Sequence, residues 1–175
     1  MDYPTRRLSH HYSTCGTWRA GAIILTAALA VIGATAAMSA DWTVSGRDGS
    51  AGVRTMSSDG TVELSGGCNA RLGPGFYVTL LYPGEALQRV DDRSEPVVFE
   101  VAFRDGATQQ FGVPMHYFAP DEAHVLSAPL PVAFLEAFAR GDTLIIRNAA
   151  GIPIADWVLT GTAAAVHRMR DICGF

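Results

Sequence analysis

The chain has 175 residues, 49% of them hydrophobic and 17% charged, and its formal net charge is −4 at pH 7. All 13 basic residues are arginine, and from Asp41 onward 10 arginines stand against 16 acidic residues, a net charge of −6. Because nucleic-acid phosphates are bound by clustered Lys and Arg, this acidic composition without a basic cluster excludes nucleic acid as a partner.

The N-terminal segment has the parts of a secretory signal. An uncharged run covers residues 20–40 and follows three arginines, which are Arg6, Arg7 and Arg19. The run is strongly apolar up to Ile32 and then consists mainly of small residues, as a signal peptidase site requires. The sequence predicts cleavage after Ala36, with cleavage after Ala40 as the alternative. We therefore interpret residues 1–40 as a signal peptide.

An uncleaved membrane anchor is the alternative for the same segment. The uncharged run is about as long as a bilayer-spanning helix, and Trp18 and Trp42 flank it as interfacial residues do. In both interpretations the arginines hold the N-terminus in the cytoplasm, so residues 41–175 are exported. The expected location is the periplasm or the exterior, or the periplasmic side of the inner membrane with residues 20–40 as the only membrane contact.

Two cysteines, Cys68 and Cys173, lie in the exported part. In an oxidising compartment an even number of cysteines usually means pairing. A metal site would need C-x-x-C spacing or neighbouring histidines, which this pair lacks. The sequence therefore predicts a structural disulfide between Cys68 and Cys173.

The first half of the exported region predicts short strands. Asp59-Gly60 lies between two β-prone runs and is a strong hairpin signal, because both residues tolerate positive φ. Residues 76–82 are β-prone and apolar on both faces, which indicates a central strand. The expected strands of this half are residues 42–45, 53–57, 61–64, 68–72 and 76–82.

The middle of the chain alternates between polar and β-prone stretches. Residues 83–96 are the most polar stretch and are expected to form a solvated loop, with room for one helical turn. Residues 97–103 alternate as a half-buried strand does, and a turn at 104–107 returns the chain along 108–113. Residues 116–130 are expected to be mostly loop, with one short strand at Val125-Leu126.

Two helices are expected in the last third. Pro131 suits the first turn of a helix over residues 131–140, and Gly141 suits its C-terminal end. Strands at 142–147 and 152–159 follow, and Thr160 or Thr162 is expected to cap a last helix at 163–172. We find no linker that would divide residues 41–175. The predicted fold is one mainly β (α+β) domain, a β-sandwich or partly closed barrel with two short helices.

Several stretches of the last third resemble a known family. They are Phe134-Leu-Glu-Ala-Phe138, Asp142-Thr-Leu-Ile-Ile146, Pro153-Ile154 and Val158-Leu-Thr-Gly161, the last leading into a helix. This order resembles the C-terminal half of the invasion-associated locus B family, small secreted proteins of alphaproteobacteria. The resemblance implies an exported β-sandwich-like protein without established catalytic residues, and in some members a role at the host interface. It supplies no site residues.

Residues 116–124 are the strongest candidate for chemistry. His116 and His124 bracket Asp121-Glu122, which suggests a metal site, but zinc sites prefer ligands closer together on one element. Pro120 prevents a continuous helix here, so a solvated acidic loop is the favoured interpretation. The exported sequence has no nucleophile elbow and no phosphate-binding loop. We therefore expect no catalytic residue, no metal and no cofactor.

Aromatic residues are the remaining candidates for binding. Phe76 and Phe111 are expected in the core, whereas Tyr117 and Phe118 lie beside a proline-containing loop and are candidates for contact with a partner. The favoured function is an exported, non-enzymatic envelope or secreted protein that binds a protein or a surface component. The alternative is a small periplasmic hydrolase or a ligand- or metal-binding module that uses the loop from His116 to His124.

Overall fold

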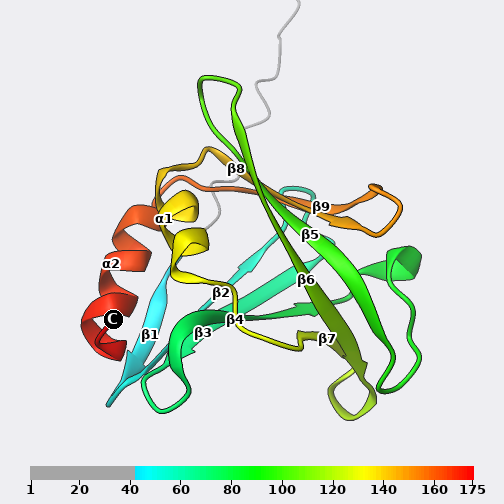
Figure 1. Ribbon diagram of the computed structural model, residues 1–175, viewed down its shortest axis with the longest axis horizontal. Coiled ribbons are helices and arrows are strands. Elements are labelled where there is room, and N and C mark those ends of the chain that lie inside the picture. The colour runs from blue at the N-terminus through cyan, green and yellow to red at the C-terminus, as the bar shows by residue number, and fades with distance from the viewer. Residues whose placement is uncertain (1–41) are drawn as a thin grey trace, which may run out of the picture. The chain divides into compact units, whose positions relative to one another are not determined.

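The computed structural model describes residues 42–175, so the run at residues 20–40, with its predicted role as signal or anchor, lies outside the described residues. Nine antiparallel strands form one sheet in the order β1-β2-β3-β4-β7-β6-β5-β8-β9 (Figure 1). The strands are β1 (Val44–Arg47), β2 (Ser50–Met56), β3 (Glu63–Asn69), β4 (Gly73–Leu81), β5 (Ser94–Ala102), β6 (Thr108–Phe118), β7 (Ala123–Leu126), β8 (Thr143–Asn148) and β9 (Pro153–Val158).

Two α-helices and two short 3₁₀ turns complete the domain. The helices are α1 (Val132–Arg140) and α2 (Thr162–Cys173), and the turns are η1 (Gly84–Ala86) and η2 (Ala119–Asp121). The predicted mainly β fold with two short helices is thus confirmed. In residues 42–175 no helix is long and apolar enough to cross a membrane.

The two ends of the sheet approach each other without pairing as strands. Trp42 Nε1, just before β1, donates to the carbonyl oxygen of Val158 in β9 at 2.8 Å. The amide of Ser58, just after β2, donates to the carbonyl oxygen of Asp156 in β9 at 2.7 Å. Because β1 and β9 themselves do not pair, the single sheet is curled but not closed into a barrel.

Helix α1 supplies the aromatic centre of the core. Alternate residues of β5 are fully buried, as the sequence pattern predicts. The ring of Phe134 in α1 lies 5.4–6.0 Å from the rings of Phe76, Phe99, Phe111 and Phe138. Each fully buried phenylalanine contributes about 1.5–3 kcal/mol of apolar transfer free energy. The helix therefore packs against β4 on one side of β7 and against β5 and β6 on the other side in the order of the sheet.

A glycine in β3 makes room for one of these rings. A Cβ atom at Gly66 would lie 2.3 Å from Cζ of Phe76, a separation that real Cβ atoms do not reach. Any other residue at position 66 would displace the ring from its place against α1. Gly66, in the Ser-Gly-Gly stretch before Cys68, is thus required for the packing of Phe76.

The predicted disulfide is present between Cys68 in β3 and Cys173 at the end of α2. The S–S distance is 2.07 Å, and the two residues are 105 positions apart in the sequence. Both are buried, with 4% and 6% of their surface exposed. The bond holds the C-terminal helix against the first half of the sheet, and closure of so long a loop stabilises a fold by about 2–4 kcal/mol.

The structure corrects several predicted boundaries. The stretch 116–130, expected to be mostly loop, contains the end of β6, the turn η2 and strand β7. The short β7 forms because it has a partner on each side, β4 and β6. The predicted threonine cap of the last helix is wrong, because Gly161 occupies the N-cap position. Thr162 Oγ1 is instead buried, 2.8 Å from the carbonyl oxygen of Phe138 and 2.7 Å from that of Leu159.

Candidate functional site

The register of β6 and β7 places His116 and His124, the two histidines of the predicted candidate site, on opposite faces of the sheet. Tyr117 pairs with His124, and His116 pairs with Val125. Because neighbouring residues of a strand point to opposite faces, His124 lies on the core face and His116 on the other. His124 is 1% exposed, whereas the half-buried His116 places its Nδ1 3.3 Å from Ser127 Oγ.

The acidic residues between these histidines do not complete a site. Asp121 and Glu122 are exposed in and after η2, where Glu122 takes a left-handed conformation at φ 50°. Across residues 42–175, no three His, Cys, Asp or Glu side chains are grouped so that they could hold a metal ion. The structure therefore does not assemble the residues of the alternative hydrolase or metal-binding interpretation.

His124 instead fastens the β4–β5 loop to the sheet. Its Nε2 lies 3.1 Å from the carbonyl oxygen of Gln88. A carbonyl only accepts, so Nε2 carries the proton and donates. Nδ1 is buried and has no partner among the described residues. Burial, which disfavours the charged ring, lowers the pKa of His124 below its ordinary value; the Gln88 hydrogen bond and the charge of Glu95 act in the opposite direction.

Further bonds hold the same loop against β6 and β8. The Gln88 amide donates to Glu95 Oε1 at 2.7 Å. Asn148 Nδ2 of β8 donates to the carbonyl oxygen of Ala86 at 3.3 Å, and the Asp92 amide donates to the carbonyl oxygen of Tyr117 at 3.2 Å. Leu87 is buried beneath the loop. The polar stretch predicted as a solvated loop is mostly exposed, as expected, and is anchored by two buried residues, Pro83 and Leu87.

The β4–β5 loop meets the β6–β7 turn at one end of the sheet (Figure 1). Three apolar side chains in or next to these segments are exposed. They are Tyr82, Val90 and Phe118, which are 60%, 50% and 40% exposed. The register places Phe118 beside Ala123 and Ala123 beside Leu81, the neighbour of Tyr82. Asp91, next to Val90, is bridged to Tyr117. We name these three residues the Tyr82–Val90–Phe118 surface.

The structure divides the predicted contact pair Tyr117 and Phe118. Phe118 is at the surface, but Tyr117 is only 9% exposed and its ring centroid lies 5.1 Å from that of His124. Tyr117 is therefore removed from the candidate contact surface and belongs to the support beneath the β4–β5 loop. Val90 was not predicted from the sequence as part of a contact surface. Its position as the one apolar residue among the four charged residues of 89–93 is the pattern that indicates an exposed apolar side chain.

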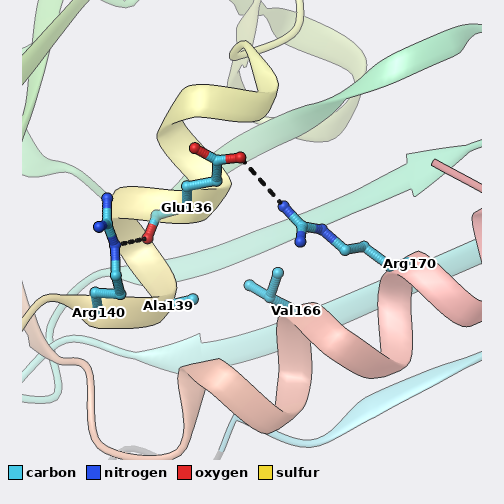
Figure 2. Close-up of a pocket in the computed structure, with 5 residues that line it drawn as sticks. All are labelled: Glu136, Ala139, Arg140, Val166 and Arg170. Carbon is cyan, nitrogen blue, oxygen red and sulfur yellow. Dashed lines mark hydrogen bonds and ion pairs between the residues drawn. The ribbon is translucent and has the colours of Figure 1, made fainter.

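A hollow of about 340 Å³ lies between the two helices. Figure 2 shows Glu136 and Arg170 facing each other across it, with Val166 between the helices. Arg170 Nη2 lies 3.9 Å from Glu136 Oε1, and these side chains are 38% and 57% exposed. Arg140 Nε donates to the carbonyl oxygen of Glu136 at 3.1 Å. The carboxylate of Glu136 offsets much of the positive charge of Arg140 and Arg170, and all three side chains are in contact with water. This hollow therefore offers no strong site for a charged ligand.

Comparisons of this chain with protein-family models, with curated proteins and with solved structures find no match.

Proposed function

We propose that residues 41–175 form an exported, non-enzymatic binding protein that recognises a protein or a component of the cell surface. The observation that carries the proposal is the Tyr82–Val90–Phe118 surface, where three large apolar side chains are 40–60% exposed on neighbouring segments, the end of β6 and the β4–β5 loop that is bridged to it. Grouped exposed apolar side chains are typical of interaction sites. The hydrogen bonds beneath them preorganise the loop, which lowers the entropy lost on binding.

The disulfide supports the exported location. Buried cysteine pairs of this kind persist in oxidising compartments and are rare in the cytoplasm. The arginine-flanked apolar run at residues 20–40 agrees with this assignment as a signal peptide or an anchor. The resemblance to the invasion-associated locus B family points to the same setting, a small secreted or envelope protein. The proposed location is the periplasm or the exterior.

Site-specific cross-linking in the native host tests the binding proposal. A photoreactive phenylalanine analogue at position 118 is expected to link the protein to one defined partner. The same analogue at Ile152 is a matched control, because Ile152 is also exposed, at 56%, but lies in the turn between β8 and β9. Equal cross-linking patterns from both positions, or none from position 118, would contradict the proposal.

Fractionation and N-terminal sequencing test the export proposal. The expected result is a periplasmic or secreted protein that begins after Ala36 or Ala40. A membrane-bound protein that keeps residues 20–40 would support the anchor, with the domain still facing the periplasm. A cytoplasmic protein with two free thiols at Cys68 and Cys173 would contradict export in both forms.

A further inference from the structure

One side of β6 has no strand partner along residues 108–113 within the described part of the chain. On its other side β6 pairs with β5 from Thr108 to His116, but β7 pairs only with Met115, His116, Tyr117 and Phe118. The amide of Ser127 still donates to the carbonyl oxygen of Pro114 at 3.0 Å. Beyond Ser127 the chain leaves β6, and Leu130 bonds instead to Phe76 of β4. We name residues 108–113 the open edge.

The alternation of bonds in an antiparallel pair shows which groups of the open edge are free. The Phe103 amide donates to the carbonyl oxygen of Ala107 at 2.9 Å, so these two residues form a hydrogen-bonded pair. Such pairs recur at every second position. The main-chain groups of Thr108, Gln110 and Gly112 therefore point away from β5. Pro114 follows the same alternation, as its bond from Ser127 confirms.

The open edge is accessible and carries no charge. Thr108, Gln109, Gln110 and Gly112 are exposed, and a Cβ atom built on Gly112 would meet nothing within 4 Å. Residues 107–114 contain no charged side chain. Proteins usually protect free strand edges with charged side chains, prolines or bulges. Here only Pro114, at one end, protects the edge.

We propose that the open edge accepts an extended segment of a partner protein as an added strand. In this mode of recognition, main-chain hydrogen bonds give affinity and alternate side chains give specificity. This inference concerns a different surface from the Tyr82–Val90–Phe118 surface, at the opposite end of β6, and does not depend on it.

The surroundings of the open edge define the segment that it accepts. The space between the hairpin turn and Ser127 matches about six extended residues, at about 3.3 Å per residue. If β6 of a second copy of the chain paired with the open edge, the hairpin that continues that strand would collide with the segment at Ser127. A short segment therefore fits better than a second copy. Phe111 and Val113 are half-buried on the core face, which favours apolar side chains at alternate positions of the added strand. The acidic domain favours a neutral or basic segment over an acidic one.

Two substitutions at one position separate the main-chain contribution from the side chain. Gly112→Pro removes the outward N–H while leaving the β5 pairing intact, since Gly112 and Val98 are not a hydrogen-bonded pair. Gly112→Ala adds a methyl group in open space and keeps the N–H. Thermal unfolding of both variants checks that each is folded.

The probe is an acetylated and amidated hexapeptide of alternating valine and threonine with one terminal arginine, added to the full chain with its disulfide intact. Amide NMR shifts at Gln110 and Gly112 report binding in the wild-type protein. The association constant is expected to fall about fivefold in Gly112→Pro, as the loss of one hydrogen bond predicts, and less than about twofold in Gly112→Ala. The same peptide methylated at alternate backbone nitrogens is expected not to bind.

Three results would overturn the inference. The first is a wild-type spectrum that the peptide leaves unchanged at millimolar concentration. The second is binding that Gly112→Pro does not weaken, with shifts confined to residues around Val90 and Phe118, which would leave the proposed function standing. The third is a set of shifts at Gln110 and Gly112 that grows with protein concentration alone, because a second copy would then occupy the edge.

Discussion

His124 Nε2 lies 3.1 Å from the carbonyl oxygen of Gln88, and this bond joins strand β7 to the β4–β5 loop. The loop carries Val90, and β7 lies between the strands that lead to Tyr82 and Phe118. His124, a titratable side chain that is only 1% exposed, therefore lies beneath the proposed contact surface. Its protonation state affects how firmly the loop is held.

Acidification is expected to destabilise the domain through His124. Burial lowers its pKa in the folded protein, so the neutral ring is favoured by folding. The contribution of neutral His124 to the free energy of unfolding is complete above the ordinary histidine pKa of about 6.5. It is lost as the pH falls from there through the lower pKa of the folded protein. Urea unfolding between pH 7.5 and 5 measures this loss. His124→Gln, which keeps an N–H donor but does not titrate, is expected to flatten the dependence; an unchanged slope would contradict the assignment.

Removal of the disulfide is expected to lower the free energy of unfolding by about 2–4 kcal/mol. The double variant Cys68→Ala/Cys173→Ala removes the bond that ties α2 to β3. Urea unfolding at neutral pH measures the change. The single variant Cys68→Ala serves as a control and should lose nearly the same amount, because either substitution breaks the whole bond. A double variant as stable as wild type would show that the bond adds nothing.

Gly66→Ala is expected to destabilise the core by about 1–3 kcal/mol, because the new methyl group collides with the ring of Phe76. Gly112→Ala is the matched control, since it adds the same group to a strand where nothing lies within 4 Å. Thermal unfolding of the two variants gives the comparison. Equal melting temperatures would mean that Phe76 moves aside without cost.

Thr162→Val is expected to lower the free energy of unfolding by about 1–3 kcal/mol. The substitution keeps the shape of the side chain but removes the hydroxyl that serves the buried carbonyl oxygens of Phe138 and Leu159. Thr162→Ser keeps the hydroxyl and should retain more of the stability than the valine variant. The order of the two variants in urea unfolding checks the assignment, and a valine variant more stable than the serine variant would refute it.

Local patterns were sufficient for much of the fold. The turn residues Asp59-Gly60 and Gly106, with the alternation of β5, predict two hairpins and a half-buried strand, because turn chemistry and side-chain alternation act between near neighbours. The pairing of Cys68 with Cys173 also followed from the sequence, since no other cysteine lies in the exported part.

The sequence by itself thus determined a mainly β domain with two short helices and one disulfide. Only the tertiary structure decided which face each residue of β6 occupies, because alternation separates Tyr117 from Phe118 without saying which one is buried. It also decided the existence of β7, a four-residue strand that depends on partners on both sides. The open edge follows from where the chain leaves β6 after Ser127, and that departure is set by the pairing of Leu130 with distant Phe76.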